Sequence, residues 1–336
     1  MREIIGILKD KISLSKLALI SKPSLLSLHV SVLRTTTHTP STPPNHHHLA
    51  TLLSLGDSSR ATASILIRSL MNRLHATNDS YVALKCLYTI HHVMKRGPFI
   101  LKDQLSLFHS SNGRNNLKLS GFREEKSATT WVLSAWVRWY ARYIETLLFT
   151  SKNIGFIICS TSCSLLEKEK QQDLISSLMN SDLIRDFNSL VVVIEELCKL
   201  PDNLLVEKDK LLHAVMELLS SDYLSIVNEI LMRFNEFQER VGLLSFYDSV
   251  ELGSCLERLI ICKGKLMDLF YNKKPFVVML WETVEELSNR IGMVSFNKIR
   301  KVDNGSESAR FGERVVRTSD SVKFSSGRLR LTWSAN

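Results

Sequence analysis

Glycine, proline and long hydrophobic runs are all scarce in this sequence. Its 336 residues include 13 Gly and 7 Pro, about half of their average usage in proteins. Because β-sandwiches and β-barrels need many Gly and Pro turns, this scarcity argues against an all-β fold. The longest uncharged apolar stretch, residues 154–166, is shorter than the roughly 20 residues that a transmembrane helix needs.

The N-terminus also lacks the uninterrupted apolar core of a signal peptide. Arg2, Glu3, Lys9 and Asp10 divide this region into short apolar pieces. We therefore expect a cytosolic protein whose contact with a membrane is peripheral.

Cysteines lie in apolar stretches of helical pattern, at Cys86, Cys159, Cys163, Cys198, Cys255 and Cys262. In a cytosolic protein we expect them to be reduced and buried. Cys159 and Cys163 are four residues apart, but no second Cys or His pair follows at the spacing of a zinc site. The sequence therefore predicts no metal centre and no cofactor.

Positive charge is concentrated near the N-terminus. Residues 1–120 carry 15 Lys and Arg against 5 Asp and Glu, whereas residues 121–294 carry 19 against 25. Residues 295–336 are basic again, with 9 against 4. A basic first third suggests a polyanionic partner, either phosphoinositide headgroups or nucleic acid, and the alternative is a solvated basic face without a ligand.

Apolar residues recur at helical spacing along most of the chain. The pattern predicts helices at residues 2–20, 25–33, 46–56, 57–76, 81–96, 130–149, 165–180, 182–199, 205–220, 222–242, 250–271 and 275–292. Asp57 or Ser58 is the expected N-cap of the fourth helix, and residues 35–45 and 110–127 are expected loops. Helices joined by short loops imply an all-α bundle or a helical solenoid.

Residues 191–194 (VVVI) have the local preference of a strand, but the helical pattern continues through Glu195 and Glu196, so we predict a helix. After Gly292 the chain becomes polar and basic, and we predict a disordered end. The expected organisation is a helical domain at residues 1–292 and a basic, Ser-rich tail at residues 293–336.

Catalytic motifs are absent: there is no phosphate-binding Gly loop, no HExxH and no nucleophile elbow. We therefore expect a protein that is not an enzyme. His91 and His92 are adjacent, but adjacent side chains on a helix point about 100° apart. We expect one of them to be buried and hydrogen-bonded and the other to be partly exposed.

Two further clusters allow more than one interpretation. His46, His47 and His48 could bind a metal, but no Cys or carboxylate is near, which favours anion binding at a helix N-terminus. The aromatic segment around Trp136 and Tyr140 is interleaved with arginines and could stack on nucleic acid. Its helical spacing favours core packing instead.

Three segments carry a family resemblance. Residues 85–97 (KCLYTIHHVMKRG) resemble a K-x-L-x-T-x-H-H-x-M-x-x-G helix, and residues 136–144 (WVRWYARYI) resemble an F-I-R-R-Y-S-R-Y-L helix. Residues 34–38 (RTTTH) and 44–49 (PNHHHL) resemble K-A-T-T-H and P-K-K-K-H-L. These are segments of ANTH domains, the N-terminal modules of clathrin-assembly proteins of the phosphatidylinositol-binding type. The opening residues 8–11 (LKDK) resemble the plant branch of that family.

The resemblance implies a right-handed α-helical superhelix and a peripheral adaptor that binds phosphatidylinositol 4,5-bisphosphate. It also implies clathrin coat assembly in endocytosis and vesicle budding, at coated pits and vesicles, the plasma membrane and the Golgi apparatus. Some members bind SNARE helices. The lipid-binding positions fall on Arg34, Asn45, His47 and His48, with His38 and His46 as further candidates and Lys9, Lys11 and Lys16 as a supporting basic surface.

This sequence departs from the family at the lipid site. Two lysines are replaced by Asn45 and by His47, whose ring is largely neutral at pH 7 if its pKa is about 6.5. We therefore expect headgroup binding to be weak at neutral pH and to strengthen as the pH falls. The tail contains no clathrin box, NPF or DPF motif, which argues against direct clathrin binding by the tail. Clathrin is expected as a partner either directly or through other adaptors.

The main alternative is a helical scaffold that binds SNARE or other helices and has weak or lost lipid binding. The adaptor hypothesis predicts that Arg34, His47 and His48 cluster near a basic surface. That surface would include Lys9, Lys11 or Lys16. The scaffold hypothesis predicts an exposed apolar groove in the C-terminal half. Nucleic-acid binding is disfavoured by the acidic middle of the chain and the lack of a known motif.

Overall fold

The computed structural model describes residues 2–20, 23–110, 117–160, 165–201, 208–270 and 275–307. Within these ranges all regular structure is helical and no strand occurs. The elements are α1 (Arg2–Ile20), α2 (Pro23–Thr35), α3 (His46–Gly56), α4 (Arg60–Ala76), α5 (Ser80–Arg96), α6 (Phe99–Ser110), α7 (Ala128–Ile154), α8 (Leu165–Ser177), α9 (Asn180–Cys198), α10 (Lys210–Arg240), the 3-10 helix η2 (Val241–Leu243), α11 (Phe246–Leu269) and α12 (Pro275–Glu307). The predicted all-α fold is confirmed.

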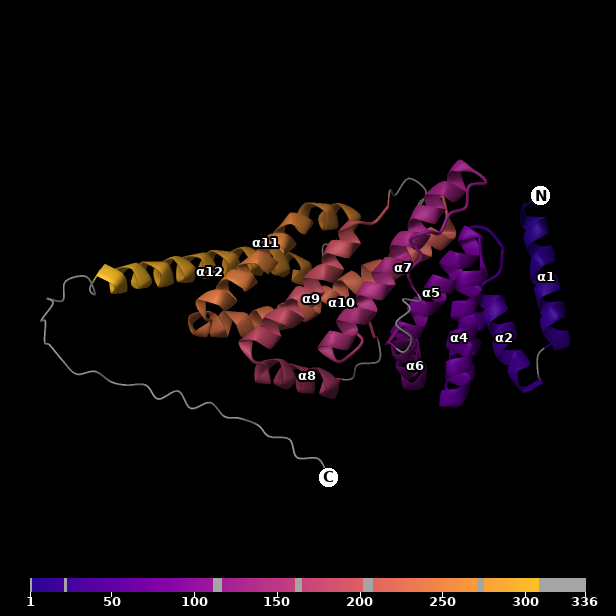
Figure 1. Cartoon of the computed structure of the whole chain (residues 1–336), viewed down its shortest axis with the longest axis horizontal. Helices are drawn as coiled ribbons and strands as arrows, with labels where there is room; N and C mark the ends of the chain where they lie inside the picture. The colour runs from indigo at the N-terminus through magenta and orange to yellow at the C-terminus, as the bar shows by residue number, and fades with distance from the viewer. Residues whose placement is uncertain are drawn as a thin grey trace, which may run out of the picture. The chain divides into compact units, whose positions relative to one another are not determined.

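The helices of residues 1–295, which form one compact unit, follow one another in chain order (Figure 1). Helix α4 packs on α6, α5 on α7, α7 on α9 and α9 on α11. Each of these helices thus contacts the helix two positions later, as expected for a superhelical stack of helical hairpins.

The core runs along this stack. Helix α5 is buried over nearly its whole length, and α7 contributes Trp136, Tyr140 and Tyr143, none of which is exposed. The aromatic segment is therefore core, as its spacing indicated, and is not available to stack on nucleic acid. Val191 and Val193 are buried inside α9, so this segment is helical and not a strand.

Side chains at loop boundaries fix where several helices begin. Asn45 caps α3 and Asp79 caps α5, each by accepting hydrogen bonds from N–H groups of the first turn. Ser59 forms a capping box at the start of α4, so the N-cap is one residue later than Ser58. Asp57, the other expected cap, instead lies at the C-cap of α3.

Helices α6 and α10 differ from the sequence prediction in the number of helices expected. Helix α6 begins directly after Pro98, whose carbonyl accepts hydrogen bonds from the N–H groups of Leu101 and Lys102. The Gly-Pro pair that ends α5 therefore also starts the next helix. Helix α10 continues without a break where two helices, 205–220 and 222–242, were expected. The polar residues at that point do not interrupt it, because Asp222 is buried in the core instead of capping a helix.

The C-terminal helix α12 continues to Glu307, past the boundary predicted at residue 292. The rest of the predicted tail, residues 308–336, lies outside the described residues. In the part of the chain that the structure describes, we find no helix with the length and apolar character needed to cross a bilayer.

Candidate functional site

Arg34, His47 and His48 line one pocket between α2 and α3. Arg34 lies in the last turn of α2, and the two histidines lie in the first turn of α3. The pocket has a volume of about 500 Å³, within the usual range of small-ligand sites. Its other lining residues are Leu26, Ser27, Val30, Ser31, Thr51 and Leu55. The site therefore combines an apolar wall with three groups that can carry positive charge.

The three basic groups of this pocket repel one another. Arg34 and His47 are exposed, whereas His48 is half-buried. Burial lowers the pKa of His48, and the nearby charges of Arg34 and His47 lower it further. A phosphate group among these side chains would act in the opposite direction and favour the protonated ring. An anion bound here would therefore be expected to raise the pKa of His48.

Asn45 and His46 come directly before the two pocket histidines in the chain, but they do not line the pocket. The Asn45 Oδ1 atom accepts a hydrogen bond of 2.8 Å from the backbone N–H of His47. Because this oxygen caps α3, the side-chain amide N–H₂ is the part of Asn45 left to face a ligand. His46 is exposed in the first turn of α3, and the pocket between α2 and α3 is not lined by it.

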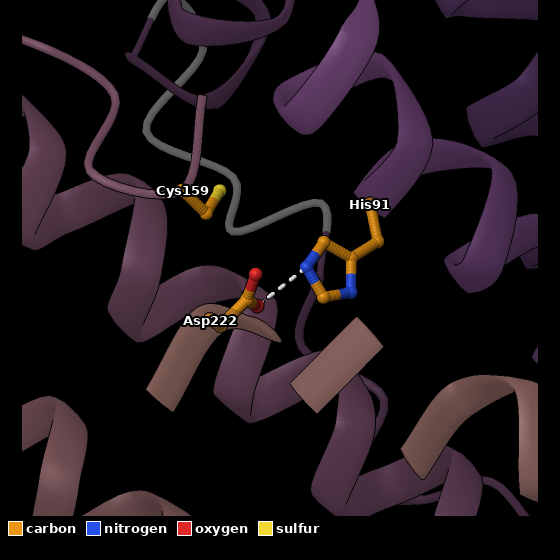
Figure 2. A group of neighbouring side chains, drawn as sticks. All are labelled: His91, Cys159 and Asp222. Carbon is orange, nitrogen blue, oxygen red and sulfur yellow. Dashed lines mark ion pairs between the residues drawn. The ribbon is translucent and has the colours of Figure 1, made fainter. Parts of the chain in front are cut away.

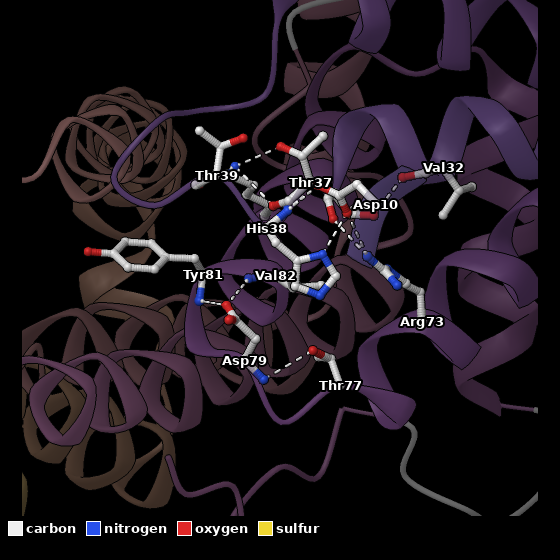
Figure 3. A network of polar contacts seen from close by, with 12 residues as sticks. Asp10, Val32, Thr37, His38, Thr39, Arg73, Thr77, Asp79, Tyr81 and Val82 are labelled. Carbon is white, nitrogen blue, oxygen red and sulfur yellow. Dashed lines mark hydrogen bonds and ion pairs between the residues drawn. The ribbon is translucent and has the colours of Figure 1, made fainter. Parts of the chain in front are cut away.

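His38 does not line this pocket and instead joins a polar network with Asp10 of α1 and Arg73 of α4 (Figure 3). Its backbone N–H donates to Asp10 Oδ2 at 2.9 Å, and its Nδ1 atom lies 2.6 Å from Asp10 Oδ1. The Arg73 guanidinium lies 3.8 Å from the same carboxylate. These contacts give His38 a role in joining the loop before α3 to α1 and α4, apart from Arg34, His47 and His48.

Lys85 anchors the same loop from the core helix α5. Its Nζ atom donates hydrogen bonds to Thr37 O at 3.1 Å, Thr37 Oγ1 at 3.0 Å and Thr39 O at 2.7 Å. Arg73 adds a hydrogen bond of 3.2 Å to the carbonyl oxygen of Thr36. Burial lowers the pKa of Lys85 to about 8. Lys85 and Arg73 thus fix the loop that joins Arg34 to the histidines of α3.

Neither Lys9 nor Lys11, two of the supporting lysines, lines the pocket between α2 and α3. Lys9 is exposed on α1 and lines a second, smaller pocket of about 240 Å³ together with His38 and Arg73. Lys11 is exposed on α1 and lines neither of these pockets. The backbone of Lys16 belongs to α1, but its side chain lies outside the described residues.

The histidine pair in α5 is buried as a whole, with 0% exposure for His91 and 4% for His92. The expectation that one ring is partly exposed was therefore wrong, because α5 is surrounded by other helices on nearly all sides. His91 Nε2 lies 2.6 Å from Asp222 Oδ2, and Figure 2 shows this contact beside Cys159. Its Nδ1 atom lies 2.8 Å from the hydroxyl of Tyr140.

His91, Cys159 and Asp222 bring possible metal-ligating atoms together within 4.8 Å of one another. The surrounding contacts do not fit a metal ion. Lys95 Nζ donates to Asp222 Oδ1 at 2.7 Å, and the Tyr143 hydroxyl donates to Oδ2 at 2.9 Å. Burial raises the pKa of the Cys159 thiol, with a contribution from Asp222, whereas a metal requires the thiolate. This cluster is a buried structural network.

Asp222 was not identified from the sequence, and Lys85 appeared only as part of a family motif. The signal for Lys85 was a lysine inside an otherwise apolar and aromatic helix. The Ser-Ser-Asp run at Asp222 gave the opposite signal, because it suggested a helix boundary.

A family model, the ANTH domain, matches residues 27–249. The chain is similar to the Arabidopsis thaliana protein named "Putative clathrin assembly protein At4g40080", with 49% identity over 341 residues that cover 97% of this chain and 93% of that protein. A second A. thaliana protein, "Putative clathrin assembly protein At5g10410", is 31% identical over 84% of each chain. "Putative clathrin assembly protein At2g01600" is 35% identical over 44% of this chain and 25% of its own length. Since the family model spans most of the chain and the fold is the expected stack of helices, this chain belongs to the ANTH domain family.

Proposed function

We propose that this protein is a peripheral membrane adaptor that binds phosphatidylinositol 4,5-bisphosphate in the pocket between α2 and α3 and promotes clathrin coat assembly. The observation that carries the proposal is the convergence of Arg34, His47 and His48 on one pocket at the N-terminus of α3. An Arg guanidinium can hold a phosphate with two hydrogen bonds. The helix N-terminus adds backbone N–H groups and a partial positive charge.

The surrounding charge supports a membrane as the source of that phosphate. Residues 1–120 carry 15 basic against 5 acidic residues, and Lys9 and Lys11 are exposed on α1. A basic surface gains about 1 kcal/mol per Lys or Arg close to an anionic leaflet. We infer a binding role and no catalysis, because His91, the candidate catalytic histidine, is fully buried and engaged with Asp222.

The composition of the pocket makes binding dependent on pH. A charge-assisted hydrogen bond to phosphate contributes about 1.5–3 kcal/mol, and about 1.4 kcal/mol changes affinity tenfold. At pH 7.4 His48 is largely neutral because its pKa is lowered from the ordinary value of 6.5. Headgroup affinity therefore rises as the pH falls toward 6, when the bound phosphate stabilises the protonated ring.

The test is co-sedimentation of the full chain with vesicles, with and without phosphatidylinositol 4,5-bisphosphate, at pH 6.0 and 7.4. We expect selective binding that is stronger at pH 6.0 and lost in Arg34→Glu. Arg185→Glu is the matched control, because Arg185 is an exposed arginine on α9 with the same change of charge. Equal sedimentation of Arg34→Glu and Arg185→Glu would place any lipid site elsewhere.

The clathrin part of the proposal rests on the family and on the names of the relatives. Clathrin could be engaged directly or through other adaptors, at coated pits and vesicles of the plasma membrane or the Golgi apparatus. Sedimentation of purified clathrin with vesicles that carry the full chain tests direct recruitment. Recruitment only after addition of a cell extract would indicate that another adaptor makes the contact.

A helix-binding scaffold is the second candidate function, and one feature favours it. A pocket of about 340 Å³ in the C-terminal half is lined by Asn188 of α9 and by Tyr247, Val250 and Arg258 of α11, among others. Tyr247 is 75% exposed, so an apolar surface is open beside polar anchors. If the vesicle experiment gives no binding at either pH, capture of a SNARE helix by this groove becomes the leading hypothesis.

A further inference from the structure

Helices α9 and α11 pack side by side. Residues later in α9 contact residues later in α11. Near the start of the seam, Asn188 Oδ1 accepts a hydrogen bond of 2.6 Å from Arg258 Nη1 and lies 3.7 Å from the Sγ atom of Cys255. Further along, both oxygens of Glu195 accept hydrogen bonds from Arg258, at 2.8 and 2.6 Å. The two helices therefore run parallel, and the end of α9 lies opposite the second half of α11.

This register places Cys198 against Cys262. The Cys198 Sγ atom lies 3.9 Å from the carbonyl oxygen of Cys262, so the Cys198 thiol lies directly beside Cys262. Cys198 is half-buried and Cys262 is 5% exposed. Ile261, the residue before Cys262, is 80% exposed, so this part of the seam lies near the surface of the protein.

Charged side chains surround the two sulfur atoms. Arg258, Lys199 and Lys265 bring positive charge near the pair, and Glu195 brings negative charge. Since the thiolate is the reactive form of cysteine, the sulfur that ionises attacks first and its neighbour can resolve the product.

We propose that Cys198 and Cys262 form a reversible disulfide when the protein meets a peroxide. The thiolate of one cysteine attacks one oxygen of hydrogen peroxide and becomes a sulfenic acid, while the O–O bond breaks and the other oxygen leaves as water after taking a proton. The sulfur of the other cysteine then attacks the sulfur of the sulfenic acid, the S–O bond breaks, and a second water leaves. Two thiols are oxidised by two electrons, one peroxide is reduced to two waters, and a dithiol reductant reverses the reaction.

The disulfide would join the end of α9 covalently to α11. It would enclose the connecting segment, including α10, in one loop, and such cross-links stabilise mainly by restricting the unfolded chain. It would also hold together the two helices that form the walls of the groove lined by Asn188 and Tyr247. Burial raises the pKa of Cys86 to about 12 and raises those of Cys159 and Cys255, so these thiols react more slowly.

The experiment treats the folded full chain with hydrogen peroxide, blocks free thiols with an alkylating reagent and maps peptides without reduction. We expect a Cys198–Cys262 linked peptide, a mass decrease of about 2 Da and a rise in Tm on the order of 5 °C, all reversed by dithiothreitol. Cys198→Ser and Cys262→Ser should each lose the linked peptide. Cys255→Ser is the matched control and should keep it, because Cys255 lies on the same seam but faces Asn188.

Two results would overturn the proposal. One is accumulation of either cysteine of the pair as sulfinic acid while the other remains free. The other is formation of links among other cysteines in equal or greater yield. If a serine variant fails to fold, as judged by circular dichroism, the peptide map of the unsubstituted protein still decides between these outcomes.

Discussion

Lys95 on α5 and Asp222 on α10 form a buried ion pair of 2.7 Å, although 127 residues separate them in the sequence. Lys95 is 3% exposed and Asp222 is not exposed. The same carboxylate accepts a hydrogen bond from the Tyr143 hydroxyl on α7 and pairs with His91. One side chain of α10 therefore joins this helix to both α5 and α7.

Replacement of this carboxylate should be strongly destabilising. In Asp222→Ala the Lys95 ammonium and the His91 ring stay buried without their acceptor, and removal of one partner of a buried pair costs about 3–5 kcal/mol. Chemical denaturation of the full chain measures the free energy of unfolding. Glu285→Ala is the control, because Glu285 pairs with Lys263 at the surface, where such pairs contribute about 0–1 kcal/mol. Similar losses in the two variants would contradict the role given to Asp222.

Stability should fall with acidity because of His92. Burial, together with the charges of His91 and Arg96, lowers the pKa of His92 to about 3. Between pH 6.5 and 3 the unfolded chain takes up a proton at this position that the folded protein does not, which costs about 1.4 kcal/mol per pH unit. His92→Phe should lessen the loss of stability between pH 6.5 and 4.5. The control His213→Gln changes an exposed histidine, and its free energy of unfolding should fall with pH as steeply as that of the unsubstituted protein. If the free energy of unfolding of His92→Phe falls equally steeply, the role given to His92 is wrong.

Lys85 should control the order of the loop at residues 36–45. In Lys85→Met three acceptor contacts on Thr37 and Thr39 are lost, and unpaired buried acceptors cost about 1–3 kcal/mol. We expect faster proteolysis within this loop and weaker vesicle binding, since the loop joins Arg34 to α3. Lys118→Met changes an exposed lysine and should alter neither property. Unchanged protease sensitivity in Lys85→Met would show that Arg73 and Asp10 hold the loop without it.

A permanent charge at position 48 should weaken the pH dependence of headgroup binding. His48→Lys stays protonated at pH 7.4, where the lowered pKa of His48 leaves the ring neutral. One added charge-assisted contact of about 1.5–3 kcal/mol corresponds to roughly 10- to 100-fold tighter binding. Vesicle titration at pH 6.0 and 7.4 measures both effects. The control His213→Lys adds the same charge on α10 and should leave the ratio of vesicle affinities at pH 6.0 and pH 7.4 unchanged. If His213→Lys tightens binding as much as His48→Lys does, the gain is a general effect of charge and not of the pocket.

Much of the fold is visible in local sequence signals. The helical period, the buried aromatic face around Trp136 and caps such as Asp79 all act within one or two turns of chain, so the sequence alone indicates them. The same local rules failed at Pro98 and at Asp222. A proline ends one helix and can also begin another, and a polar residue that would cap a surface helix can instead be buried when a distant partner neutralises it.

Some parts of the candidate site can likewise be predicted from the sequence, and others cannot. The sequence by itself determined that Arg34, His47 and His48 flank one short loop, because the last turn of one helix, the loop and the first turn of the next are consecutive. The tertiary structure alone decided that His38 pairs with Asp10, 28 residues earlier, and that Lys85 holds the loop from 46 to 48 residues away. Ion pairs and hydrogen bonds between distant residues leave no periodic signal in the chain, because only the packing of helices brings their atoms within reach.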